Sequence, residues 1–107
     1  MTTNFVHRVT LFKIPNVDDQ DRLLEKYKGA QQKALKDGKP YIVRIEAGKT
    51  EDDVRNQGYT VCAKSTFESM EDFHYYDKDC PAHAEIRSLA QSVHKGVMMV
   101  YYKSVVP

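Results

Sequence analysis

The segment from residue 5 to residue 14 limits the possible folds more than any other part of the chain. It is rich in β-branched and aromatic side chains and ends at Pro15, which predicts a β-strand. Strand side chains alternate between two faces. One face carries Phe5, His7, Val9 and Leu11, and the other carries Val6, Arg8, Thr10, Phe12 and Ile14. Because both faces are largely apolar, we expect both to be covered.

An amphipathic helix is predicted next. Asn16 is a suitable N-cap, and acidic Asp18 and Asp19 follow it in the first turn. The next apolar residues fall on one arc of a helical wheel. They are Leu23, Leu24, Tyr27, Ala30, Ala34 and Leu35. Asp37 and Gly38, with Pro40 beyond them, predict the end of this helix.

The remaining patterns complete a recognisable order of elements. Strands are predicted at residues 41–47, 59–67 and 97–102, and residues 49–58 form a charged surface loop. Ser69 caps a short helix, and a second helix starts at Pro81. The order βαββαβ predicts an α+β, ferredoxin-like domain spanning residues 1–107, with helices on one face of an antiparallel four-stranded sheet.

One face of the sheet lacks helices. We expect His7, Val9 and Leu11 to point toward the helices. The other face would then be apolar, carrying Val6, Thr10, Phe12, Ile14, Met98, Val100 and Tyr102. Because such a face is costly to leave in water, we predict a homodimer in which two sheets pack face to face.

Composition excludes several classes of function. The 16 Lys and Arg nearly balance the 15 Asp and Glu, so neither nucleic-acid nor membrane-surface binding is expected. No apolar run is long enough to span a bilayer, and the start of the chain does not resemble a secretory signal. We therefore expect a cytoplasmic protein whose Cys62 and Cys80 are free thiols that bind no metal.

His83 is the strongest candidate for chemistry. It lies near the start of the helix that begins at Pro81, where the helix dipole disfavours an imidazolium. A neutral imidazole near physiological pH suits a general base. The alternative is a helix-start histidine bonded to the backbone. His74 and His94 are expected to be solvated, and Cys80 is a weaker candidate nucleophile beside His83.

The chain resembles the stress-responsive A/B barrel family of dimeric α/β barrel proteins over nearly its whole length. The resemblance is carried by residues 6–13, 46–49, 58–59, 65–76 and 81–83. It implies a homodimer with a pocket between sheet and helices in each subunit. The nearest enzymatic likeness is to olivetolic acid cyclase, a polyketide cyclase without metal or organic cofactor. That likeness implies catalytic roles for His83, Tyr76 and His7, although this chain has one extra residue between Tyr76 and His83.

Three functions remain open from the sequence. The first is a cofactor-independent cyclase or lyase in which His83 removes a proton next to a carbonyl of a small polyketide-like or phenolic substrate. The expected pocket walls are Val9, Leu11, Tyr27, Ala63, Ser65, Val97, Met99 and Tyr101. The second is a non-catalytic stress-responsive protein or small-ligand binder. The third is a cofactor-free monooxygenase of the antibiotic-biosynthesis type.

Overall fold

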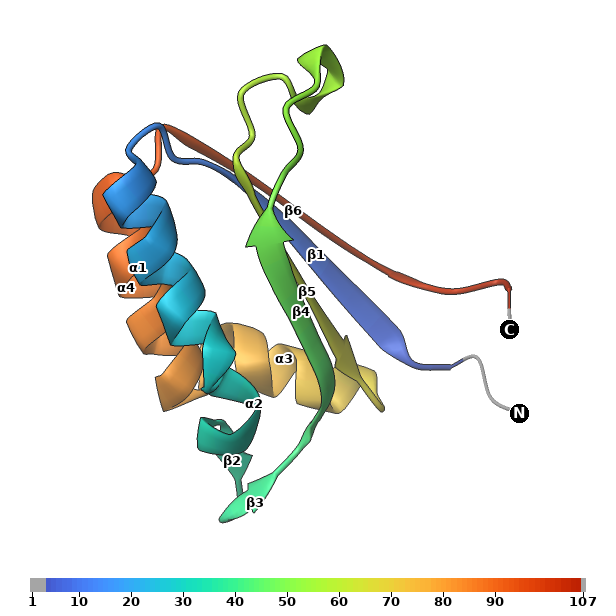
Figure 1. Cartoon of the computed structure of the whole chain (residues 1–107). Coiled ribbons are helices and arrows are strands. Elements are labelled where there is room, and N and C mark those ends of the chain that lie inside the picture. Colours follow the sequence, from blue (N-terminus) through green and yellow to red (C-terminus); the bar gives the residue numbers. More distant parts are fainter. Residues whose placement is uncertain (1–3, 107) are drawn as a thin grey trace.

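A four-stranded antiparallel sheet of order β4-β5-β1-β6 organises the computed structural model, which describes residues 4–106. The strands are β1 (Val6–Lys13), β4 (Ile42–Lys49), β5 (Val61–Phe67) and β6 (Gly96–Lys103). The helices are α1 (Val17–Lys28), α2 (Ala30–Lys33), α3 (Met70–Lys78) and α4 (Pro81–Val93). Helices α1 and α4 lie side by side against one face of the sheet, and α3 crosses near one end of it (Figure 1). The predicted ferredoxin-like α+β fold is confirmed.

The helix starts follow the predicted capping residues. The Asn16 side chain accepts a hydrogen bond from the Asp19 amide at 3.1 Å, and the Ser69 hydroxyl accepts one from the Asp72 amide at 3.1 Å. Each bond satisfies a backbone donor that the first turn leaves free, which is worth about 1 kcal/mol. Pro81 occupies the first position of α4, where its missing N–H costs nothing.

The first helix ends earlier than the sequence pattern predicted. Helix α1 ends at Lys28, α2 ends at Lys33, and a small hairpin joins β2 (Leu35–Lys36) to β3 (Lys39–Pro40). The hairpin turn places Asp37 at φ 54° and Gly38 at φ 78°. An Asp-Gly pair with two positive φ angles is a strong hairpin signal, and here it prevails over the apolar helical arc.

The two faces of β1 are the reverse of those predicted. Val6, Phe12 and Ile14 are buried under the helices, with at most 5% of each side chain exposed. His7, Val9 and Leu11 lie on the opposite face, each beside a residue of β6. The facing pairs are His7 with Tyr102, Val9 with Val100, and Leu11 with Met98. Because both faces of this strand are apolar, alternation alone could not identify the one that meets the helices.

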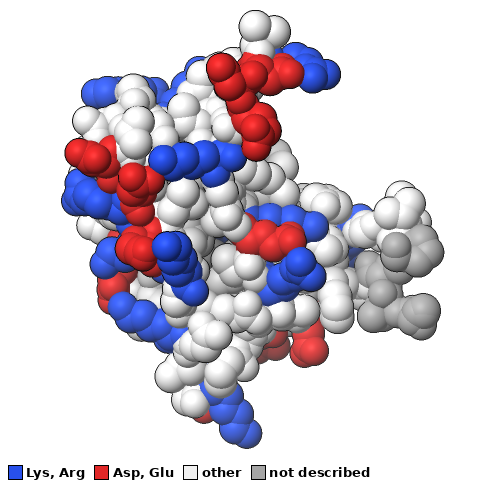
Figure 2. All heavy atoms as spheres, in the orientation of Figure 1, with Lys and Arg blue, Asp and Glu red and all other residues white. Residues whose placement is uncertain are grey.

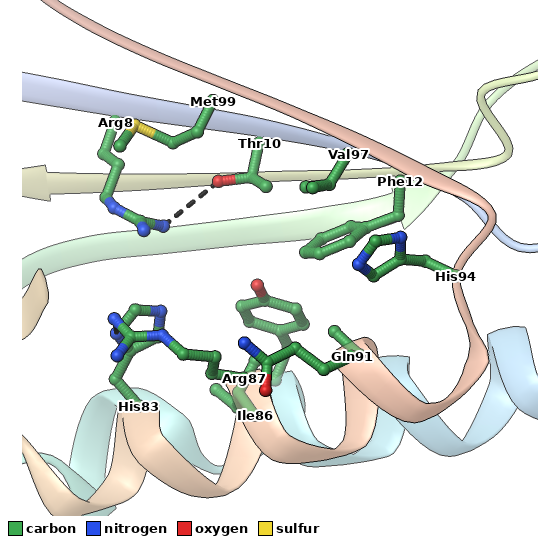
Figure 3. Close-up of a pocket in the computed structure, with 12 residues that line it drawn as sticks. Arg8, Thr10, Phe12, His83, Ile86, Arg87, Gln91, His94, Val97 and Met99 are labelled. Atoms are coloured by element: carbon green, nitrogen blue, oxygen red, sulfur yellow. Dashed lines mark hydrogen bonds between the residues drawn. The ribbon is translucent and has the colours of Figure 1, made fainter.

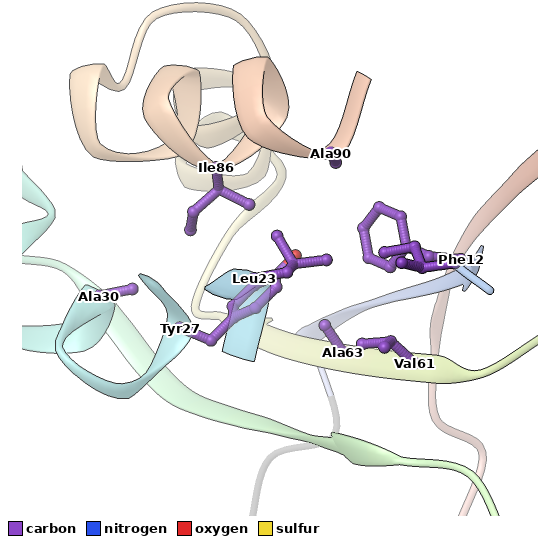
Figure 4. Close-up of a cluster of buried hydrophobic side chains, with 9 residues drawn as sticks. Phe12, Leu23, Tyr27, Ala30, Val61, Ala63, Ile86 and Ala90 are labelled. Atoms are coloured by element: carbon purple, nitrogen blue, oxygen red, sulfur yellow. The ribbon is translucent and has the colours of Figure 1, made fainter. Parts of the chain in front are cut away.

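The helix-side core consists of two apolar clusters. In one, Phe12 of β1 packs with Leu23 and Tyr27 of α1 and Ile86 of α4 (Figure 4). The other cluster consists of Val6, Ala34, Ile42, Phe67, Phe73, Tyr76, Cys80 and Ala82. Between Val6 and Phe12, the inner face of β1 carries two polar residues, Arg8 and Thr10, so the strand places polar groups between the two clusters.

The surface matches the balanced charge of the chain. Acidic and basic side chains lie next to one another across the face shown in Figure 2. None of the helices formed by residues 4–106 is long and apolar enough to cross a bilayer.

Candidate functional site

A cavity of about 210 Å³ lies between the sheet and α4. Its polar lining residues are Arg8, Thr10, His83, Arg87, Gln91 and His94. Its apolar lining residues are Phe12, Tyr27, Ile86, Ala90, Val97 and Met99. In Figure 3 the strand residues form one wall and the side chains of α4 form the facing wall. An engineered apolar cavity of ~150 Å³ is known to hold benzene, so this space suits a small, ring-sized ligand.

Two periodicities build these walls. On β1, the residues two apart, Arg8, Thr10 and Phe12, share the inner face, and their partners across the sheet are Tyr101, Met99 and Val97 of β6. On α4, intervals of three and four residues bring one row of side chains to the cavity. That row is His83, Ile86, Arg87, Ala90, Gln91 and His94.

Arg8 is a buried cation in the cavity wall. Only 9% of its side chain is exposed, and its two terminal nitrogens donate to Thr10 Oγ1 at 3.0 Å and to Asp77 Oδ1 at 3.1 Å. The guanidinium carbon also lies 5.3 Å from the centre of the Tyr76 ring, a cation–π distance. These contacts hold a permanent positive charge at the cavity wall, since a guanidinium does not lose its proton in proteins.

His83 is held in one tautomer. Its Nδ1 lies 2.8 Å from the backbone carbonyl oxygen of Tyr76. A carbonyl can only accept, so Nδ1 carries the proton and Nε2 keeps its lone pair. Within residues 4–106, Nε2 makes no hydrogen bond. The Arg87 nitrogen at 3.4 Å from Nδ1 is a weaker contact, because Nδ1 already donates to the carbonyl.

The surroundings of His83 favour its neutral form. The residue is only 4% exposed. Burial, and after it the positive charge of Arg8, lower the pKa of His83 to about 4, although the hydrogen bond to the Tyr76 carbonyl acts in the opposite direction. The imidazole is therefore neutral at pH 7, as a general base must be, although its intrinsic basicity in the empty pocket is low.

Tyr76 supports His83 from behind. The two rings stack with centroids 4.0 Å apart and an interplanar angle of 19°. Tyr76 is 1% exposed and does not line the cavity, and its hydroxyl lies near Ser65 without a hydrogen bond of ordinary geometry within residues 4–106. Burial raises the pKa of that hydroxyl to about 12, so it stays protonated at neutral pH. The extra residue before His83 thus leaves the two side chains in contact.

The structure brings some of the predicted site residues together. His83, Tyr27, Val97 and Met99 line the cavity. Ala63 and Ser65 lie on the inner face of β5, opposite Thr10 and Arg8, but are buried beneath the cavity lining. Tyr101 faces the helices, yet its ring packs on that of Phe73, with the ring centroids 4.2 Å apart, and does not line the cavity.

Three predicted site residues lie elsewhere. His7, Val9 and Leu11 are on the helix-free face of the sheet, so they cannot line a pocket on the helix side. His7 stacks on Tyr102 with centroids 5.0 Å apart. The correction has one physical cause, because an error of one residue in a strand moves every side chain to the opposite face.

The cavity also contains residues that sequence reasoning did not assign to it. Arg8 occupies the inner position that the sequence argument gave to His7. His94, expected to be solvated, lines the cavity, and its buried Nδ1 has no partner within the described part of the chain. The available signals were an arginine inside an apolar strand and the intervals of three and four residues that connect His83, Arg87, Gln91 and His94.

The geometry does not support Cys80 as a nucleophile beside His83. Cys80 packs in the second apolar cluster, 3% exposed, and does not line the cavity. Cys62 and Cys80 are both free thiols, as predicted. No three His, Cys, Asp or Glu side chains among residues 4–106 are placed to hold a metal ion.

The fold and cavity define a small ferredoxin-like α+β protein with a ligand-sized pocket between its sheet and its last helix. The model of the Stress responsive A/B Barrel Domain matches residues 6–104. The chain therefore belongs to the stress-responsive A/B barrel family.

One relative is similar in sequence over most of its length. A Fusaristatin A biosynthesis cluster protein of Gibberella zeae is 43% identical over 99 residues, which is 92% of this chain and 72% of that protein. This similarity agrees with the match to the family. The likeness to olivetolic acid cyclase remains a prediction.

Solved structures share the fold. A hydroxynitrile lyase from Passiflora edulis matches with a TM-score of 0.80 and 17% identity, over 99% of this chain and 98% of that one. A dimeric ferredoxin-like protein of Bacteroides fragilis matches with a TM-score of 0.72 and 20% identity, over 97% of this chain and 100% of that one. SnoaB, a cofactor-independent oxygenase of Streptomyces nogalater, matches with a TM-score of 0.72 and 8% identity, over 97% of this chain and 96% of that one. At these identities the likeness extends to the fold alone.

Proposed function

We propose that this chain forms a homodimeric, cofactor-independent lyase or cyclase of aldol type, in which His83 removes a proton next to a carbonyl group. One observation carries the proposal. The Tyr76 carbonyl holds Nδ1–H of a neutral His83, which leaves the Nε2 lone pair unbonded in a pocket that also contains the Arg8 guanidinium. A base beside a fixed cation is the pair that enolate formation needs.

The two groups have complementary roles. Nε2 takes the proton, and negative charge then develops on the carbonyl oxygen, where Arg8 stabilises it. Arg8 lowers the pKa of His83 in the empty pocket. An oxyanion bound beside Arg8 offsets that charge, so the basicity of His83 rises as the enolate forms. The apolar wall of Phe12, Ile86 and Val97 keeps water away from the reacting end.

Tyr76 acts in this proposal as a positioning residue. Its backbone carbonyl selects the tautomer of His83, and its ring supports the imidazole by stacking. Its hydroxyl is buried outside the cavity lining, so we assign it no proton transfer. His7 takes no part, because it lies on the other face of the sheet.

We propose a homodimer formed through the helix-free face of β1 and β6. Val9 and Val100 are neighbours at the centre of this face, with Leu11 beside Met98 and His7 beside Tyr102. Val100 is 54% exposed and Met98 is 44% exposed in the single chain. A second copy would remove this apolar surface from water, and the dimeric ferredoxin-like proteins among the structural neighbours support a dimer.

The substrate class that we propose is a small polyketide-like or phenolic carbonyl compound. The cavity volume of about 210 Å³ suits a compact ring. The name of the Gibberella zeae relative places that protein in a biosynthesis cluster, which supports a role in small-molecule biosynthesis for this chain too.

Proton exchange tests the proposal without knowledge of the final product. Phenylacetone is incubated in deuterated buffer at neutral pD, and loss of the methylene proton signal is followed by NMR. We expect wild type to exchange these protons at least about 100-fold faster than His83→Gln, the low end of a general base's contribution. Equal rates would reject the catalytic role and favour a non-catalytic binder. Oxygen uptake during exchange would instead favour the monooxygenase hypothesis.

A further inference from the structure

The pocket has a positive lining with no carboxylate of its own. Among its described lining residues, Arg8 and Arg87 carry permanent charge, His83 and His94 are the other titratable side chains with nitrogen bases, and none is Asp or Glu. Asp77 lies behind the wall, 3.1 Å from Arg8 and 3.9 Å from Arg87. The single negative charge of Asp77 therefore faces two positive guanidinium groups, which leaves an excess positive charge at the cavity.

Arg8 also has unused hydrogen-bonding capacity. Of its five N–H groups, the structure pairs one on each terminal nitrogen, with Thr10 and with Asp77. Its Nε has no partner within residues 4–106, but it has almost no accessible surface and so does not face the open cavity. Each terminal nitrogen of Arg8 keeps a second N–H, and these are the donors that remain for a polar ligand in the cavity that Arg8 lines.

We infer that the pocket binds a small carboxylate with an apolar body, anchored by Arg8. A carboxylate oxygen pair can accept from the remaining N–H groups of the guanidinium in a charge-assisted contact. The body would lie toward Phe12, Ile86 and Val97, which form the apolar part of the lining. This inference rests on the proposed function, since it narrows the substrate of the same site to a carbonyl compound that also carries a carboxylate and makes Arg8 its specificity-determining residue.

The apolar part of the site argues against a free inorganic anion. The cavity is large enough for an aromatic ring, and six of its lining side chains are apolar, including two from α4. A carboxylate on a ring or short chain matches both parts, because its charged end meets Arg8 while its carbon skeleton displaces water from the apolar wall.

Binding of benzoate and benzamide tests the inference. The two probes have nearly the same shape and differ in charge, and their dissociation constants are measured by NMR titration at neutral pH and low salt. We expect wild type to bind benzoate at least about tenfold more tightly than benzamide. Arg8→Met should remove that difference while changing benzamide affinity less than about twofold. Equal affinities in wild type, or an unchanged preference in Arg8→Met, would overturn the inference.

Two further variants keep the test decisive if Arg8→Met does not fold. Asp77→Asn removes the carboxylate that competes for Arg8, so benzoate should bind more tightly and benzamide should not. Arg8→Lys retains the cation and should keep a preference for benzoate, weaker than in wild type because the planar fork is lost. Weaker benzoate binding in Asp77→Asn would refute the anchor role of Arg8.

The outcome is separable from that of the proposed function, because binding requires no turnover. A benzoate preference without proton exchange on phenylacetone would refute the catalytic proposal and leave the carboxylate site standing. Exchange on phenylacetone without any preference for benzoate would refute the carboxylate site but would support His83 as the base.

Discussion

The pH dependence of stability provides a measure of how strongly the fold keeps His83 neutral. The folded protein lowers the pKa of His83 from 6.5 to about 4. Between these values the unfolded chain binds a proton that the folded chain does not, so stability falls as pH falls from 6.5 through 4. At 1.36 kcal/mol per pKa unit, the full effect is about 3 kcal/mol. Above pH 6.5 His83 is neutral in both states, so this loss of stability is absent there.

Urea unfolding of wild type and His83→Gln measures this effect. Gln never titrates in this range and its amide can still donate to the Tyr76 carbonyl, so the variant is a matched control. Between about pH 7.5 and about pH 4.5, wild type should lose roughly 2.5 kcal/mol more free energy of unfolding than His83→Gln. Other titrating groups, such as His7, are common to both proteins and cancel. Equal losses would refute the assignment of a buried, neutral His83.

Three further substitutions test separate parts of the structure. Val100→Asp should dissociate the proposed dimer, because an unpaired carboxylate would be buried, whereas Val54→Asp, in the short 3₁₀ helix Val54–Asn56 and 93% exposed, should not. Sedimentation equilibrium measures both, and a dimeric Val100→Asp would place the interface elsewhere. Phe12→Ala should cost about 3–5 kcal/mol of unfolding free energy, and a loss below about 1 kcal/mol would contradict its place in the core. Tyr76→Phe should retain stability and should keep the rate of proton exchange within about threefold, since the hydroxyl makes no hydrogen bond of ordinary geometry in the described structure; a loss of about 100-fold in rate would restore a catalytic role to that hydroxyl.

The sequence was sufficient to predict the order of the four sheet strands and the main helices. Strand composition, the capping residues Asn16 and Ser69 and the proline at residue 81 are local signals, and each marks an element that the structure contains. The hairpin at Asp37 and Gly38 was missed because the apolar helical arc extends to Leu35, so that Asp37 and Gly38 were interpreted as the end of the helix. Two local signals competed there, and the turn geometry decided between them.

The site was only partly predictable, for reasons that differ between its two walls. His83 lies near the start of the helix predicted from Pro81, and the family resemblance implied its place in a pocket, so its position could be predicted from the sequence. Arg8 lies on a strand with two apolar faces, and the pattern cannot orient such a strand. Only the packing of Phe12 and Ile14 against Leu23 and Ile86 places Arg8, and not His7, in the pocket.

The central claim is that neutral His83 is the base. The most direct test is the dependence of kcat/KM on pH for proton exchange on phenylacetone, which reports the pKa values of the free enzyme. We predict that the rate rises along an acid limb centred near the pKa of about 4 and is level by neutral pH, and that this limb is absent from His83→Gln. A limb centred at or above the ordinary histidine value of 6.5, or the same profile in His83→Gln, would contradict the account.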